Sequence, residues 1–112
     1  MRTRSRTSGD VVVVDLEGQL VAGTGDEQLN KLMNQLLADG HKKIILNLAD
    51  VSRMDSSGLG ELVSGAQLAK RFGSSVRLVR PQKAVRKVLE ISRLLPAFDL
   101  HDSESEAIAA FG

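Results

Sequence analysis

The residues best placed to do chemistry are two neighbouring serines that follow an aspartate, in the string Asp55-Ser56-Ser57-Gly58-Leu59-Gly60. An apolar stretch typical of a buried strand, Ile44 to Leu48, precedes this string, and helical apolar spacing begins at Leu59. The serines therefore lie at the predicted N-terminus of a helix, where free backbone N–H groups and the positive end of the helix dipole are found. In open α/β folds such a strand-to-helix junction lies at the edge of the sheet that presents binding sites.

Two interpretations of this string stay open on the residues alone. In the first, Asp and Ser only cap the helix, and the glycines mark a tight turn. In the second, a serine accepts phosphate, which carries about −1.5 to −2 charges. A helix N-terminus tolerates such an anion, so the domain would stay folded. The phosphate would instead block a partner docked on this helix end, by its bulk and by repulsion with Asp55 and Glu61.

The glycines of the string point to a close approach of backbone. Glycine costs ~1 kcal/mol relative to Ala inside a helix, and Gly58 and Gly60 fall in one turn. We therefore expect that either a binding partner or a neighbouring strand packs tightly against this turn.

Catalytic and cofactor sites find little support in the sequence. A serine hydrolase would need His41 or His101 as its base, and both are predicted to be exposed loop residues. No Gly-x-Ser-x-Gly elbow is present, and Gly23-Thr24-Gly25 lacks the pattern of a phosphate-binding loop, which leaves nucleotide binding as a minor alternative. The chain has no Cys and two His, so we expect no metal site. The sequence predicts a protein that is not an enzyme and needs no cofactor.

The elements that must position the serines alternate between strands and helices, which predicts an α/β fold with a mostly parallel sheet. Val11 to Val14 predicts a strand buried on both faces, followed by a turn at Glu17 to Gln19 and a short strand from Leu20. Apolar residues at helical spacing predict a helix over residues 26–39, capped by Thr24 or Asp26.

The second half of the chain continues this alternation. The further predicted elements are a strand at 44–48, a polar loop at 49–57, a helix that ends before 73, a strand at 76–79, a helix at 82–91, a strand at 97–100 after a break at Pro96, and a last helix capped by Ser103.

Composition and charge narrow the class of partner. The chain has 112 residues with 42% apolar and 3% aromatic residues, which fits one domain with an aliphatic core. The net charge of +1 and the scarcity of aromatics predict no binding of nucleic acid and no membrane insertion. A locally basic set is interpreted as a solvated face: Arg77, Arg80, Lys83, Arg86, Lys87 and Arg93. We expect a cytoplasmic protein, since nothing in the sequence directs export.

The string also carries a family resemblance. Asn47-Leu48, Asp50 and Met54 to Gly60 resemble the STAS domain, and within it the bacterial anti-sigma factor antagonists. Glu17 to Leu20 corresponds to the Gly-x-Leu turn of that family. The strand at 76–79 and the helix after it also fit, so the resemblance covers nearly the whole chain from Asp10.

The resemblance implies a single STAS domain over residues 1–112, with a four- to five-stranded, mostly parallel or mixed sheet packed against about four helices. We expect residues 1–9 to form either a polar edge strand or a flexible tail. The resemblance also implies partner switching. The unmodified protein binds an anti-sigma factor with serine kinase activity, the kinase phosphorylates Ser56, and a phosphatase removes the phosphate. The implied partner-binding residues are Asp55, Ser56, Ser57, Gly58, Leu59 and Gly60, with Val21 and Thr24 from the neighbouring loop.

The chain departs from the family at one position of that loop. Many such antagonists carry Asp directly after the Gly-x-Leu turn, and this sequence has Val21. STAS domains also serve as scaffold parts of the stressosome and as small subunits of lipid-transport ATPase complexes, and this is the alternative function. A weak homodimer also stays open.

Overall fold

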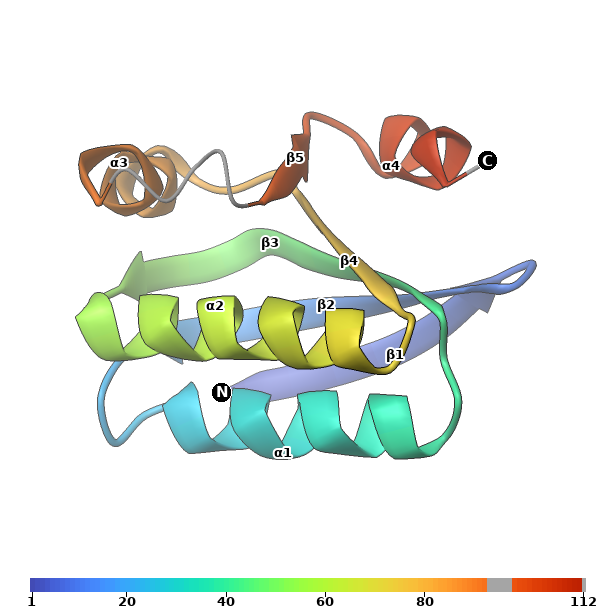
Figure 1. Ribbon diagram of the computed structural model, residues 1–112. Coiled ribbons are helices and arrows are strands. Elements are labelled where there is room, and N and C mark those ends of the chain that lie inside the picture. The colour runs from blue at the N-terminus through green and yellow to red at the C-terminus, as the bar shows by residue number, and fades with distance from the viewer. Residues whose placement is uncertain (93–97, 112) are drawn as a thin grey trace.

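A five-stranded mixed sheet forms the centre of the computed structural model, which describes residues 1–92 and 98–111 (Figure 1). The strands are β1 (Arg2–Ser8), β2 (Val11–Leu20), β3 (Lys43–Met54), β4 (Ser75–Val79) and β5 (Asp99–His101). The helices are α1 (Asp26–Ala38), α2 (Ser56–Arg71), α3 (Lys83–Ile91) and α4 (Glu104–Ala110). The strands lie in chain order across the sheet, with β1 antiparallel to β2 and the other pairs parallel. This confirms the predicted fold class.

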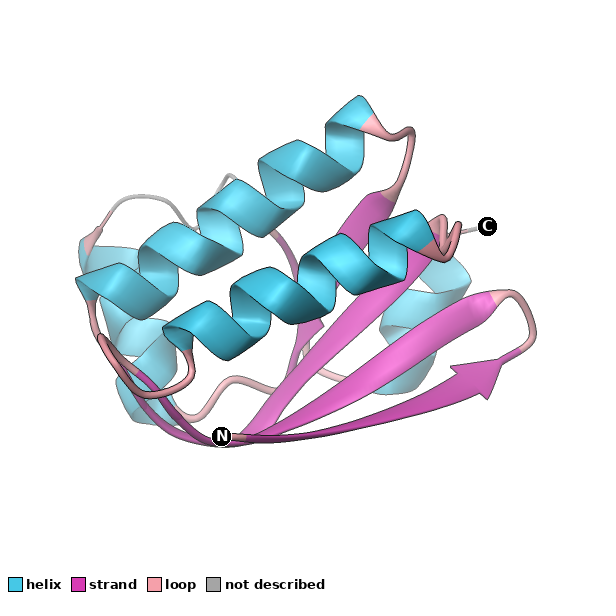
Figure 2. Cartoon of the chain, turned by 90° about the horizontal axis from the view of Figure 1, so that it is seen from below, coloured by secondary structure: helices cyan, strands magenta, loops and turns pink. Residues whose placement is uncertain are grey.

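The helices α1 and α2 lie side by side on one face of the sheet (Figure 2). Alternate residues of β2 supply the two faces, as the period of a strand requires. Val12, Val14 and Leu16 join the main core with α1, α2 and α3. Val11 and Val13 belong to a smaller apolar cluster on the opposite face, which Ala107 of α4 covers. Burial on both faces explains the uninterrupted valine run, as predicted.

The predicted helix over residues 26–39 is confirmed as α1, and its start is capped as expected in part. The carboxylate of Asp26 accepts a hydrogen bond from the backbone N–H of Glu27 at 2.9 Å. Among the described residues the Thr24 side chain makes no hydrogen bond to the start of α1, and its backbone forms a turn with Val21. The N-cap position is taken by Gly25, whose φ of 94° favours glycine.

Two predictions about the strands are wrong, and they have one cause. The predicted turn at residues 17–19 lies inside β2, which runs without a break to Leu20. The predicted loop at residues 49–57 is largely strand, because β3 extends to Met54. Beyond Asn47, β3 no longer pairs with β4 but still pairs with the end of β2, through register shifts beside Glu17 and Gly18. Such irregularities put polar residues and a glycine into a strand, which therefore reads as a turn in the sequence.

The C-terminal half follows the prediction with small shifts. The strand β4, the helix α3 and the helix α4 are confirmed, and the Ser103 hydroxyl accepts from the N–H of Glu106 at 3.2 Å. The predicted strand at 97–100 is observed as β5, whereas positions 96 and 97 lie outside the described residues. His101 was expected in a loop but belongs to β5, and its ring nitrogen lies 3.0 Å from Arg77.

Among the described members of the basic set, three are exposed, as predicted (Arg80, Lys83 and Lys87), whereas Arg77 and Arg86 are half-buried, and Arg86 lies 3.4 Å from Asp102. The guanidinium of Arg77 is half-buried and stacks 4.8 Å from the ring centroid of Phe111, so it holds α4 against the sheet. Arg93 lies outside the described residues. Within residues 1–92 and 98–111, no helix is both long enough and apolar enough to cross a membrane.

The packing of Leu46 in β3 gives a test of the main core. Leu46 is 1% exposed in the main core, between strands on both sides. Replacing Leu46 with Ala should lower the free energy of unfolding by about 2–5 kcal/mol, because it leaves a cavity. Ile91 is 71% exposed, so Ile91→Ala should change stability by less than about 0.5 kcal/mol. Urea denaturation of both variants checks this, and equal losses would contradict the assigned core.

Candidate functional site

The candidate site lies where β2 and β3 end together. Leu20, the last residue of β2, pairs with Met54, the last residue of β3. The chain then enters a turn after β2 and the helix α2 after β3, so both segments emerge at one edge of the sheet (Figure 1). This arrangement, the Ser56 junction, brings together the turn after β2 and the start of α2, the two segments in which the sequence predicts partner binding.

Asp55 connects these two segments. It is the N-cap of α2, and its Oδ1 accepts a hydrogen bond from the N–H of Gly58 at 3.0 Å. Its Oδ2 accepts from the N–H of Ala22 at 3.0 Å, and its own N–H donates to the carbonyl of Leu20 at 3.3 Å. The backbone N–H of Ala22, followed by that of Gly58, holds the pKa of the Asp55 carboxyl below its ordinary value. Asp55 is therefore ionised at neutral pH and is a structural element of the site.

Ser56 and Ser57 are the first two residues of α2, and both are exposed. No hydrogen bond of either hydroxyl is found within residues 1–92 and 98–111. Each hydroxyl is thus open to solvent at the positive end of a sixteen-residue helix. The geometry allows an enzyme to reach either one.

The two glycines of the string have different roles. A Cβ on Gly58 would collide with the carbonyl oxygen of Leu20, so this glycine lets the end of β2 pack against α2. The expected tight packing is therefore supplied by a neighbouring strand at Gly58. A Cβ on Gly60 would meet nothing within 4 Å. Leu59 is 6% exposed and belongs to the main core, so its side chain does not form surface.

The turn after β2 is a small hairpin. The N–H of Val21 donates to the carbonyl of Thr24, and the N–H of Thr24 donates to the carbonyl of Val21, both at 2.9 Å. Gly23 within this turn has a φ of 74°. Val21 is half-buried, and Thr24 is exposed beside the start of α1. Thr24 is therefore more accessible to a partner than Val21.

Sequence reasoning anticipated a cap from Asp or Ser at the start of α2, which the bond of Asp55 with Gly58 confirms, but it missed the bond of Asp55 with Ala22. The N–H of Ala22 belongs to the turn after β2, and no side-chain pattern in the sequence indicates its contact with Asp55. Glu61, expected as a free acid near the site, accepts a hydrogen bond from Asn30 of α1 at 3.2 Å. Within the described residues, no group of three His, Cys, Asp or Glu side chains is placed to bind a metal ion.

The chain belongs to the STAS domain family, whose profile matches residues 2–107. It is 34% identical over 77 residues to a Thermotoga neapolitana protein assigned as an anti-sigma factor antagonist, a match that covers 69% of this chain and 68% of the relative.

Three solved structures are similar over nearly the whole chain. The crystal structure of protein TM1081 from Thermotoga maritima, likewise assigned as an anti-sigma factor antagonist, has a TM-score of 0.88 and 28% identity, over 96% of this chain and 92% of that one. The unphosphorylated form of the anti-sigma factor antagonist SpoIIAA has a TM-score of 0.73 and 25% identity, over 98% of this chain and 97% of that one. The phosphorylated form of Bacillus SpoIIAA has a TM-score of 0.72 and 26% identity, over 99% of this chain and 100% of that one.

Gly58 and Gly60 give a matched test of the packing between the end of β2 and the start of α2. Gly58→Ala should destabilise the fold by about 1–3 kcal/mol, because the end of β2 must move away from α2. Gly60→Ala adds the same methyl group to open space in the same helical turn and should be neutral, or stabilising by up to about 1 kcal/mol. Thermal denaturation distinguishes the two, and a Gly58→Ala variant as stable as wild type would contradict the packing described here.

The lowered pKa of Asp55 predicts a dependence of stability on pH. A carboxyl with a lower pKa in the folded state contributes stability above its unfolded pKa, and this contribution is lost as the pH falls through the folded pKa. Asp55→Asn keeps one side-chain acceptor for the cap but loses the titration. Urea midpoints measured from pH 7 to pH 3 should fall more for wild type than for Asp55→Asn, and parallel curves would exclude this role.

Proposed function

We propose that this protein is an anti-sigma factor antagonist whose binding to an anti-sigma factor with serine kinase activity is blocked by phosphorylation of Ser56. A phosphatase restores the binding-competent form. The single observation that carries this proposal is the exposed Ser56 hydroxyl at the first position of α2, directly after an N-cap that fixes the helix end. The similarity to SpoIIAA, a protein with an unphosphorylated and a phosphorylated form, supports it.

The fold tolerates a phosphate at Ser56 for a local reason. The hydroxyl has no contact that a phosphate must break among the described residues, and the helix N-terminus favours an anion. The carboxylate of Asp55 stands next to it in the chain and is ionised. Phosphorylation therefore changes the combined charge of residues 55 and 56 from about −1 to between about −2.5 and −3, while the hydrogen bonds of Asp55 persist.

The surface presented to the kinase follows from exposure. Ser56, Ser57, Gly60 and Thr24 are exposed around the junction. Gly58 and Leu59 support this surface from beneath, since they pack against β2 and into the core. Ser56 lies about one helical turn before Gly60. A partner that fits closely over Gly60 would therefore exclude a bulky phosphate on Ser56, and the added charge would repel any acidic group of that partner.

Phosphate mapping tests the acceptor. The protein is incubated with an anti-sigma factor kinase that binds it and with ATP, and the product is mapped by mass spectrometry. Ser57→Ala should still be labelled, whereas Ser56→Ala should not, because the proposal assigns the phosphate to Ser56 alone. Labelling of Ser57 or another residue with Ser56 unmodified defeats the assignment.

A charge-matched pair tests the switch itself. Ser56→Asp should weaken binding to the kinase at least tenfold and keep stability within about 0.5 kcal/mol, as expected of an exposed position. Ser64 is exposed on α2 about two turns further on, and Ser64→Asp carries the same charge with no expected loss of binding. Calorimetric titration provides the affinities. If both variants weaken binding equally, Ser56 does not lie at the surface that binds the kinase.

A further inference from the structure

We propose a second interaction surface, distinct from the Ser56 junction: the free edge of β1 binds an acidic, extended segment of a partner protein by strand addition. The segment would carry carboxylates at alternate positions and extend the sheet beyond β1.

The outer edge of β1 is open along its whole length. In the described part of the chain β1 pairs with β2 alone, and all seven of its residues are exposed. Its register with β2 is continuous from Arg2 opposite Glu17 to Ser8 opposite Val11, with no bulge. The strand contains no proline. Its far side therefore offers an unbroken row of N–H and C=O groups that can pair with another strand.

Alternation places the arginines on one face. Arg4 is opposite Asp15, and Arg6 is opposite Val13, on the face that carries α4. Thr3, Ser5 and Thr7 are opposite Leu16, Val14 and Val12, on the face of α1 and α2. The edge thus has one cationic side and one side of small hydroxyl residues.

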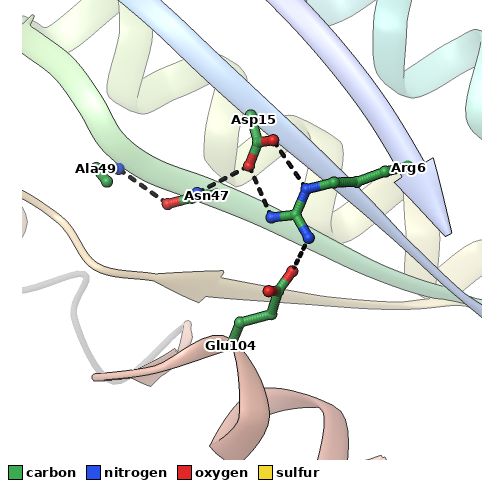
Figure 3. A network of polar contacts seen from close by, with 5 residues as sticks. All are labelled: Arg6, Asp15, Asn47, Ala49 and Glu104. Atoms are coloured by element: carbon green, nitrogen blue, oxygen red, sulfur yellow. Dashed lines mark hydrogen bonds and ion pairs between the residues drawn. The ribbon is translucent and has the colours of Figure 1, made fainter. Parts of the chain in front are cut away.

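The three arginines differ in how far they are already paired. Figure 3 shows Arg6 in two hydrogen bonds with Asp15, at 2.9 and 3.0 Å, and in an ion pair with Glu104. Arg2 is 86% exposed and lies 3.6 Å from Glu17, a pair of little strength at such exposure. Arg4 makes no ion pair within residues 1–92 and 98–111. Arg2 and Arg4 are therefore available to a ligand.

The acidic residues on this face do not neutralise the positive charge that an added strand would meet. A shallow open hollow of about 490 Å³ has the arginines of β1 along one side and four residues of β2 and β3 along the other: Asp15, Glu17, Asn47 and Asp50. A strand added outside β1 lies about 4.8 Å from β1 and about twice that from β2. Its side chains meet the arginines first, so carboxylates are favoured and ammonium groups are not.

A second copy of this chain fits the edge poorly. Antiparallel pairing about Ser5 is the alignment that joins all seven residues, and it places Arg4 of each copy opposite Arg6 of the other. Like charges directly opposite each other destabilise a strand pair. The arginines thus disfavour self-association and leave the edge to a strand of opposite charge.

Peptide titration tests the proposal on the intact protein. The probe is a blocked octapeptide of alternating Thr and Glu, with binding followed by backbone amide chemical shifts and by hydrogen exchange. We expect the shifts to centre on β1 and the exchange of β1 amides to slow at least tenfold. The same peptide with Lys in place of Glu should not bind. A peptide of the same length and charge with Pro at two neighbouring central positions lacks an N–H there on both edges and cannot form a continuous ladder, so it should leave the exchange unchanged.

Two matched variants separate the arginine row from net charge. Arg4→Gln and Ser5→Glu each lower the net charge by one, on opposite faces of the same strand. Arg4→Gln should weaken the binding of the acidic peptide about two- to fivefold, as expected for the loss of one exposed ion pair. Ser5→Glu should weaken its binding less. Equal binding of the Pro-containing and Thr-containing peptides, or shifts centred on the Ser56 junction instead of β1, would overturn the proposal.

Discussion

The candidate site depends on the hydrogen bonds of one carboxylate. Asp55 uses one oxygen for the N–H of Gly58 and the other for the N–H of Ala22, while its own N–H binds Leu20. These bonds fasten the end of β2, the turn after it and the start of α2 to one another. The close approach is possible only because Gly58 has no side chain where the Leu20 carbonyl lies. Ser56 is exposed at a defined place because the residues on both sides of it are held by backbone contacts.

The opposite face of the sheet combines an apolar and a polar half. Near the start of β2, α4 covers a small apolar cluster. Further along, Asn47 donates to Asp15 at 2.8 Å and accepts from the N–H of Ala49 at 3.1 Å, and Asp15 in turn holds Arg6 (Figure 3). Arg6 also pairs with Glu104 of α4. Networks with a bidentate arginine are stronger than single surface pairs, so this chain of contacts ties the last helix to the edge strand.

The sequence was sufficient for the elements whose burial is regular. The valine run of β2 and the leucine spacing of α1 predicted a strand and a helix at the observed places. It failed at residues 17–19 and 49–54, where two strands pair with each other through register shifts and carry polar residues outward. It also placed Leu59 on the partner surface, because a motif shared by a family does not distinguish residues that pack from residues that bind. The capping role of Asp55 was among the interpretations of the string, but its bond with Ala22 escaped prediction, since a backbone N–H in a distant turn leaves no trace in residue types.

The departure of this chain at Val21 fits the way the turn is held. The hydrogen bonds that fix the turn use its own backbone groups: Val21 pairs with Thr24, and the N–H of Ala22 donates to the carboxylate of Asp55. The side chains at these positions are therefore free to change without loss of the junction. Gly25 is not, because a Cβ there would collide with the carbonyl of Gln19 and its φ is positive. A turn fixed by its backbone can vary its exposed side chains to suit one partner or another, while the serine beside it keeps its position.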